Sequence, residues 1–287
     1  MSRRVSSSRR WSTALAALLL AACSRLEPVH PALWEVTGPG GQKAWLFGTI
    51  HALPDPVDWR SGPVDAALNA SDRVVLEVAA IRDGAAIGQE IERLGAAPAS
   101  LPLRERVRPE LRPTYDALIR QLKIDETALA SRDTWAAALA LAQAAQRGEG
   151  TDPANGIDRA LAASGKPLGE LEGATAQLQI FDTLPESEQR DLLAAVIREE
   201  PERDLTRAWK SGDLAPLEQA TREGMLADPE LREALYAERN RRWTVRLVEA
   251  MRGGGHPFVA VGGMHLVGPE GLPTLLAARG YTVRRVQ

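Results

Sequence analysis

Short apolar runs of strand length alternate with longer stretches in which apolar residues recur at helical spacing. Glycine, proline or a charged turn bounds most of the runs. They cover residues 33–36, 43–50, 73–78, 167–172, 257–261 and 281–286. This order of strands and helices predicts an α/β domain whose central sheet has about five or six strands with helices around it.

The two ends of this pattern predict how the strands run. At the amino-terminal end, the turn Gly38–Gly41 separates two strand-like runs, which indicates an antiparallel hairpin and therefore a mixed sheet. At the carboxyl-terminal end, strand Pro257–Val261, helix Pro269–Arg279 and strand Tyr281–Val286 form a strand–helix–strand unit. Such a unit predicts a right-handed parallel crossover.

The segments near 84–150 and 185–252 are helical in pattern, and we expect them to form a layer beside the carboxyl ends of the strands. The best-marked helix runs from Asp228 to Gly253. Its i+4 ridge consists of Leu231, Leu235, Arg239, Trp243, Leu247 and Met251. Arg239 is the polar member of an otherwise apolar ridge. It can reach solvent along the ridge, pair with a carboxylate, or hold an anionic group of a substrate.

Residues 1–22 have the composition of a secretory leader. Four arginines precede an apolar run that is too short for a permanent membrane span, and the run ends in Leu20-Ala21-Ala22-Cys23. That ending resembles a bacterial lipobox, which implies cleavage before Cys23 and lipidation of its thiol. The alternative is an ordinary signal followed by a chance cysteine. Residues 23–30 are then a lipidated tether, residues 31–287 the domain, and the expected location is the periplasmic face of the outer membrane.

Charge and cysteine content narrow the function classes. The net charge of −3 becomes −7 once the four arginines of residues 1–22 are removed, and the remainder has no lysine- or arginine-rich block. This composition argues against a nucleic-acid partner. Cys23 is the one cysteine of the chain, which excludes an internal disulfide.

Two Gly-x-x-His segments carry the strongest chemical signal. Gly48–His51 and Gly262–His265 each close a strand-like run, and the chain holds only four histidines. Glu77 and Glu172 also stand at predicted strand ends. Ligands of open α/β sheets bind in the crevice outside the carboxyl ends of the strands. We therefore expect His51, Glu77, Glu172 and His265 to meet there.

Two imidazoles with one or two carboxylates suit a divalent transition metal: Mn²⁺, Fe²⁺, Co²⁺ or Zn²⁺. The alternative interpretation makes both histidines structural and both glutamates helix caps or surface acids. Asp158, in Gly156-Ile157-Asp158, has two interpretations as well. It is either a helix-terminal acid or a hydrogen-bond partner that orients one of the histidines.

These motifs resemble the TraB/GumN family, which is similar to the Tiki metalloproteases of animals. The resemblance rests on LFGTIH (46–51), VVLEV (74–78), GID (156–158), LE (171–172), ERN (238–240) and the long match at 259–286. It implies a Mn²⁺- or Co²⁺-dependent peptidase in which His51, His265 and Glu77 bind the metal, with Glu172 and Arg239 as further candidates. TraB is associated with shutdown of a peptide pheromone and GumN with an exopolysaccharide cluster, so the resemblance alone does not fix the substrate.

The sequence thus predicts a metal-dependent hydrolase, preferably a peptidase, acting on a peptide or another small envelope substrate. His51, Glu77 and His265 are the expected metal ligands, Glu172 the general base and Arg239 the group that stabilises an oxyanion. The roles of the two glutamates are interchangeable at this stage. The alternative is a non-catalytic envelope module that binds a peptide or glycan in the same cleft.

Overall fold

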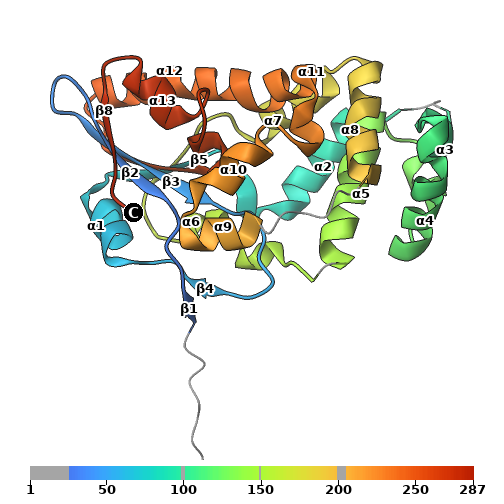
Figure 1. Ribbon diagram of the computed structural model, residues 1–287, viewed down its shortest axis with the longest axis horizontal. Helices are drawn as coiled ribbons and strands as arrows, with labels where there is room; N and C mark the ends of the chain where they lie inside the picture. The colour runs from blue at the N-terminus through green and yellow to red at the C-terminus, as the bar shows by residue number, and fades with distance from the viewer. Residues whose placement is uncertain (1–25, 98–100, 149, 199–204) are drawn as a thin grey trace, which may run out of the picture.

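A computed structural model of the protein describes residues 26–97, 101–148, 150–198 and 205–287. The leader 1–22 and Cys23 lie outside the described residues. The strands form a six-stranded sheet of order β6-β5-β7-β3-β2-β8 and a separate pair β1-β4 (Figure 1). They are β1 (Glu27–Pro28), β2 (Leu33–Thr37), β3 (Lys43–Thr49), β4 (Val57–Asp58), β5 (Arg73–Leu76), β6 (Leu168–Glu170), β7 (Pro257–Gly262) and β8 (Thr282–Arg285).

The six-stranded sheet is mixed, as the sequence predicts. Strands β6, β5, β7 and β3 run parallel to one another, whereas β2 pairs antiparallel with β3 and with β8. The predicted hairpin of β2 and β3 is therefore confirmed. Strand β8 runs in the direction of β7, as expected for the terminal strand–helix–strand unit. It does not pair with β7, because β3 and β2 lie between them.

Alternating side chains of the central strands bury both faces of this sheet. On β3, Trp45 and Phe47 face one side while Ala44 and Leu46 face the other. Helices α1 (Gly62–Ala70), α6 (Ile157–Ala162) and α9 (Leu205–Ser211) contribute to the first face, and α12 (Glu238–Arg252) and α13 (Leu272–Ala277) pack on the second (Figure 1). A strand that is apolar on both faces reads as a continuous hydrophobic run, which is the pattern seen in the sequence.

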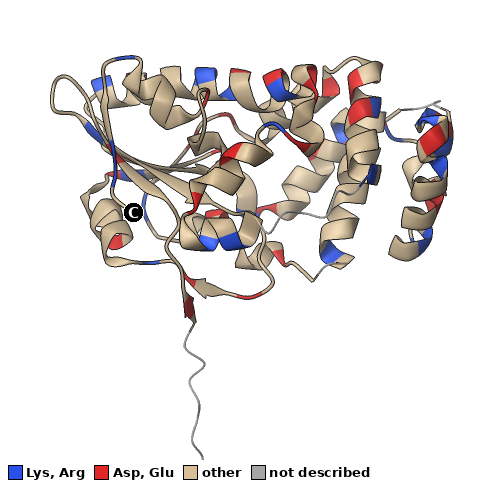
Figure 2. Ribbon diagram, viewed as in Figure 1, with Lys and Arg blue, Asp and Glu red and all other residues tan. Residues whose placement is uncertain are grey.

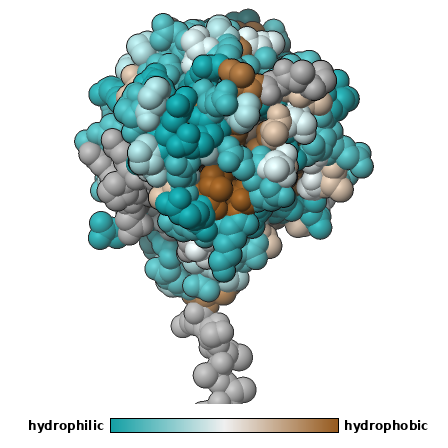
Figure 3. Space-filling view, turned by 90° about the vertical axis from the view of Figure 1, so that its right-hand side faces the viewer, coloured by the Kyte–Doolittle hydropathy of each residue, from teal (hydrophilic) through white to brown (hydrophobic). Residues whose placement is uncertain are grey.

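The remaining helices build a separate hydrophobic core beside the sheet, so the predicted helical layer is confirmed. Trp135, Tyr115 and Leu193 are fully buried there. The helices concerned are α2 (Gly84–Leu94), α3 (Leu103–Arg106), α4 (Arg112–Leu122), α5 (Thr134–Gly148), α7 (Ala174–Asp182), α8 (Glu186–Arg198) and α11 (Pro229–Arg232). Helix α10 (Leu214–Ala220) packs instead with Ala208 of α9 and with Val267 in a small separate cluster. Seen from this end, the surface is mostly hydrophilic with small recessed hydrophobic areas (Figure 3).

One long helical segment connects the two parts of the molecule. It begins with α11, passes through a π-helical turn at Glu233–Ala237 and continues as α12. Every residue of the predicted i+4 ridge is buried, including Arg239 at 8 % exposure. The opposite face of α12 carries interleaved charges, and Arg241 and Arg242 both form ion pairs with Glu238 (Figure 2).

Several predicted boundaries move inward. The helix expected at 269–279 spans only α13, and the strand expected at 167–172 spans only β6. Part of the predicted tether also has structure, because β1 pairs with β4 and Val29 is 2 % exposed. Among the described residues, no helix is both long enough and apolar enough to cross a membrane.

Candidate functional site

Four neighbouring parallel strands each deliver one candidate side chain at the carboxyl end. His51 follows β3, Glu77 follows β5, Glu172 follows β6, and His265 lies in the short 3₁₀ turn Gly263–Leu266 after β7. Because β6, β5, β7 and β3 are adjacent in that order, these residues arrive along one edge of the sheet. The grouping of these four residues at one sheet edge, expected from the sequence, is therefore present.

Gly262 marks the centre of this group. A Cβ atom placed on Gly262 would lie 3.5 Å from Glu77 Oε1, 3.7 Å from His51 Nε2 and 3.8 Å from His265 Cδ2. The three side chains thus surround the space that a side chain at this position would fill. Because His51 Nε2 and His265 Cδ2 both lie within 4 Å of this one point, the two imidazole rings are close enough to share a site.

His51 is oriented by Asp158. Its Nδ1 atom donates a 2.8 Å hydrogen bond to Asp158 Oδ2, and Thr49 Oγ donates to the other carboxylate oxygen at 2.6 Å. Asp158 is 2 % exposed, so both oxygens are held inside the protein. Gly156 makes this approach possible, because a Cβ there would lie only 2.2 Å from the carbonyl oxygen of His51. The Gly-Ile-Asp motif thus serves to orient His51.

His265 is oriented in the same way by a residue of α12. Its Nδ1 atom donates to Asn240 Oδ1 at 2.7 Å, while Asn240 Nδ2 donates to the carbonyl of Glu270 and so fixes the amide orientation. Trp243 packs against the imidazole with ring centroids 4.6 Å apart, and Tyr236 lies on it at 5.7 Å. Both histidines therefore use Nδ1 for a protein partner and leave Nε2 for another one.

Arg239 lies between the two glutamates and does not extend to solvent. Its Nη2 atom donates to Glu77 Oε2 at 2.7 Å, and its Nε and Nη2 atoms both donate to Glu172 Oε1. Its Nη1 atom also lies 3.4 Å from His265 Nε2. Glu172 accepts a second bond from Trp243 Nε1 at 3.3 Å. Of the three sequence-based interpretations of Arg239, pairing with the site carboxylates is confirmed.

The charges of the site follow from this arrangement. Burial alone raises the pKa of Glu77, but the interactions with His265, Arg239 and His51 outweigh it and lower that pKa to about 2. Burial lowers the pKa of His265 to about 3, so its imidazole is neutral. The carboxylate of Asp158 raises the pKa of His51 to about 9 against the opposing effect of burial. The metal-free site thus holds one ionised carboxylate at Glu77, a neutral His265 and a protonated His51.

The donor set suits a divalent transition metal. Nε2 of His51, Oε1 of Glu77 and the Cδ2 edge of the His265 ring border one space, and each histidine has the Nδ1 partner that metal-binding histidines require. Arg239 is the cation that competes for Glu77 and His265 in the structure described. The residue types and their partners fit a metal, and the guanidinium is the group with which the metal must compete.

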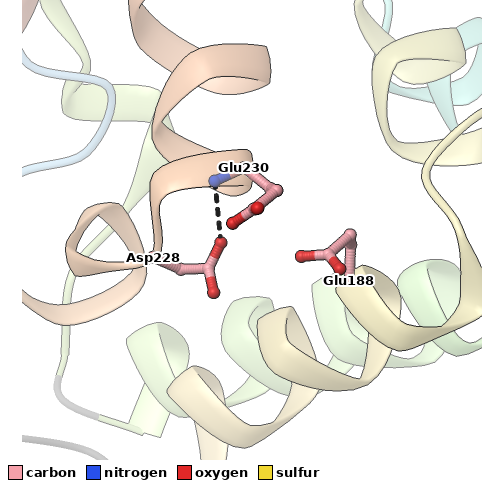
Figure 4. Close-up of side chains that lie close together, drawn as sticks. All are labelled: Glu188, Asp228 and Glu230. Carbon is pink, nitrogen blue, oxygen red and sulfur yellow. Dashed lines mark hydrogen bonds between the residues drawn. The ribbon is translucent and has the colours of Figure 1, made fainter.

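Among the described residues, a different group, made of acidic residues alone, meets a geometric test for a metal site that His51, Glu77 and His265 do not meet. Carboxylate oxygens of Glu188, Asp228 and Glu230 lie within 4.8 Å of one another (Figure 4). However, Asp228 Oδ1 already accepts the backbone N–H groups of Glu230 and Leu231 as the cap of α11. Acidic side chains at a helix start are common without any ligand, so this group gives no functional signal.

The family follows from a match that includes this whole site. The model of the TraB/PrgY/gumN family matches residues 32–285. The chain belongs to this family. The match contains His51, Glu77, Glu172, Arg239 and His265, together with Asp158 and Asn240, which orient the histidines. Searches of curated proteins and of solved structures found no match.

Several site residues of this TraB/PrgY/gumN chain were not found by sequence reasoning. Asn240 and Trp243 lie on α12 beside Arg239, where a polar residue and an apolar ridge residue looked structural. Gln177, on α7, donates a 3.3 Å hydrogen bond from its Nε2 atom to Glu77 Oε2. The one available signal was their spacing: positions 239, 240 and 243 share a helix face.

Proposed function

We propose that the protein is a metal-dependent hydrolase of the peptidase class. One observation carries this proposal: the two Gly-x-x-His histidines both bind a fixed acceptor through Nδ1, and both rings border the position of Gly262 together with the ionised carboxylate of Glu77. A purely structural histidine needs no such paired arrangement across two distant segments. The arrangement is that of ligands whose ring orientation and tautomer are set in advance.

His51, Glu77 and His265 would hold the metal. When bound, a divalent metal polarises a substrate carbonyl and lowers the pKa of water from about 16 to about 7. The low pKa of Glu77 suits a ligand, because a carboxylate with a pKa of about 2 is a poor proton acceptor at neutral pH. The assignment of Glu77 as the ligand among the two glutamates is therefore favoured by its electrostatics.

Glu172 and Arg239 have linked roles in this proposal. Both oxygens of Glu172 are engaged, by Arg239 and by Trp243, and its side chain is 5 % exposed. This geometry favours positioning of Arg239 over direct proton transfer, and the role of Glu172 as a base stays a prediction. Arg239 would present its guanidinium to the negative charge that develops on the carbonyl oxygen of a scissile bond.

Metal analysis of four histidine variants tests the proposal. Protein purified without chelator is expected to carry close to one transition metal per chain, and His51→Ala and His265→Ala are each expected to lose most of it. His30→Ala and His256→Ala are matched controls, since both residues are exposed and outside the site. Wild-type protein that cannot take up Mn²⁺, Co²⁺, Fe²⁺ or Zn²⁺ would overturn the proposal. It would favour a binding module in which Arg239 is the cation of the cleft.

We further propose an envelope location, on the periplasmic face of the outer membrane, from the leader and Cys23. Lipidation of the Cys23 thiol anchors the chain without a spanning helix. Cys23→Ser is expected to release soluble protein or to leave the precursor uncleaved. Membrane fractionation and lipid labelling measure this. Unchanged fractionation with no lost label would exclude lipidation of Cys23.

A further inference from the structure

An apolar pocket opens directly beside His51 and Glu77. Its volume is about 300 Å³, and it lies between the carboxyl end of β5 and helices α2, α5 and α7. His51, Glu77 and Gln177 border it on the side of the site. The His51 side chain is 61 % exposed, so this border is open to solvent and to a ligand.

The rest of the lining is almost entirely aliphatic or aromatic. Ile87 comes from α2, Leu139 from α5, and Ala174, Leu178 and Phe181 from α7. The carboxylates at the border already have partners, since Glu77 binds Arg239 and Asp158 binds His51. A charged or hydroxyl-rich group would therefore lose its hydration in the pocket and gain few hydrogen bonds in return.

We propose that this pocket receives an apolar side chain of a peptide substrate, the residue next to the bond that is cut. This inference rests on the proposed hydrolase function and adds the substrate feature that the site selects. The volume is at the lower end for ligand pockets, which suits one large or two small side chains and excludes a bulky glycan. With the side chain in the pocket, the peptide main chain lies at the polar border formed by His51, Glu77 and Gln177.

The strength of the selection can be stated as a ratio. One methylene group in a hydrophobic pocket changes discrimination by roughly 10- to 200-fold. Leucine or phenylalanine beside the scissile bond is therefore expected to be preferred over glycine by at least about tenfold. The preference should depend on the pocket volume, because its walls contact the side chain.

Ala174 provides the variant that tests this inference. It is the first residue of α7, is half-buried and lines the pocket, so Ala174→Phe fills the pocket. Ala176→Phe is the matched control, because Ala176 lies on the same helix, is exposed and lines a different cavity with Arg242 and Arg246. Should Ala174→Phe fail to fold, Ile87→Phe fills the pocket from α2.

The first arm measures binding without any reaction. Acetyl-leucine amide and acetyl-phenylalanine amide are titrated into metal-free protein and followed by NMR, with acetyl-glycine amide as reference. Both apolar amides are expected to bind at least about tenfold more tightly than the glycine amide. Ala174→Phe is expected to lose this tenfold advantage, and Ala176→Phe is expected to keep it. Equal binding of all three amides would overturn the inference. Tighter binding of octanoate than of the leucine amide would assign the pocket to an acyl chain.

The second arm measures hydrolysis of a mixed peptide library by protein loaded with Mn²⁺ or Co²⁺. Cleavage is expected beside large apolar residues, and Ala174→Phe is expected to shift it to sites with alanine or glycine. Cleavage without side-chain preference would overturn the pocket inference and leave the hydrolase standing. Selective binding of the amides without cleavage under any metal would overturn the hydrolase and leave the pocket as a peptide-binding site.

Discussion

Arg239 donates a 2.7 Å hydrogen bond to Glu77, and the two side chains are only 9 % and 8 % exposed. This ion pair places the guanidinium next to the group expected to bind the metal. It keeps Glu77 ionised in a buried environment, and through Glu172 it connects the end of β6 to the same network. The stability of the fold and the chemistry of the site therefore depend on one arginine.

Arg239→Ala is expected to destabilise the protein by about 3–5 kcal/mol, because it leaves two buried carboxylates without their cation. The free energy of unfolding from urea titration measures this. Arg241→Ala is the control: Arg241 lies on the same helix, its side chain is 43 % exposed, and it pairs with Glu238 at 2.7 Å. Its loss should cost under about 1 kcal/mol. Equal unfolding midpoints for the two variants would contradict the structural importance of the buried network.

Gly262→Ala is expected to keep the fold and impair the site. The backbone of Gly262 has φ −49° and ψ 135°, which alanine adopts, and the nearest atom to the new methyl group would be Glu77 Oε1 at 3.5 Å. The methyl group would nevertheless occupy the space shared by His51, Glu77 and His265. We expect an unfolding midpoint near that of the wild type and a large loss of bound metal.

Gly169→Ala is the corresponding control in β6, where a new Cβ meets only the Val75 side chain at 3.4 Å. Elemental analysis and thermal melting are run on both glycine variants. A Gly262→Ala protein that retains the full complement of metal would show that the metal, if any, binds elsewhere.

Asn240→Ala is expected to lower metal affinity by roughly 10- to 100-fold, because His265 loses the acceptor that holds its Nδ1 proton and ring orientation. Titration with Co²⁺, followed by its visible absorption, gives the affinity. Asn155→Ala is a suitable comparison, since that amide donates to loop carbonyls of Leu53 and Pro54 away from the histidines. Identical Co²⁺ affinities in the two variants would remove Asn240 from the site.

The Asp158–His51 pair predicts a pH dependence of stability in the metal-free protein. The pKa of His51 is raised from 6.5 to about 9, so the folded state binds its proton more tightly than the unfolded state. The resulting stabilisation is fully present below pH 6.5 and is lost as pH rises through about 9. Solvent exposure of the imidazole reduces its size.

Asp158→Asn removes the carboxylate that raises this pKa. Melting temperatures of wild type and Asp158→Asn are therefore expected to differ more at pH 6 than at pH 10. Metal affinity of the wild type should rise over pH 7 to 9, because a bound metal displaces the proton from Nε2 of His51. The same difference in melting temperature between wild type and Asp158→Asn at pH 6 and at pH 10 would mean that Asp158 does not control the protonation of His51.

The sheet edge could be predicted because its signals are local. A strand-length apolar run followed by glycine and histidine indicates both a strand end and a residue that turns over it, and this holds for β3 and β7. The carboxyl ends of parallel strands lie at one edge, so the grouping of His51 and His265 followed from topology. Two-residue strands such as β1 have no periodic pattern, and its pairing with β4 could not be predicted.

The partners of the site residues depend on helix rotation, which the sequence pattern did not provide. In the sequence, Arg239 is the polar exception on an apolar ridge. Its ion pairs with Glu77 and Glu172 form because of the way α12 packs over the strand ends. Asn240 and Gln177 gave no signal of their own, since an amide is common on a helix surface. Such contacts are set by tertiary packing and are not visible in local periodicity.

The π-helical turn Glu233–Ala237 changes the rotation of α12 about its axis relative to α11. A π turn contains about one residue more than an α turn, and each residue advances an α-helix by about 100°. Arg239, Asn240 and Trp243 are thus out of phase with the helix that precedes them, and they face the strand ends because of that one extra residue. A chain lacking that residue would keep every side chain of the site but would turn three of them away from the strand ends by about 100°.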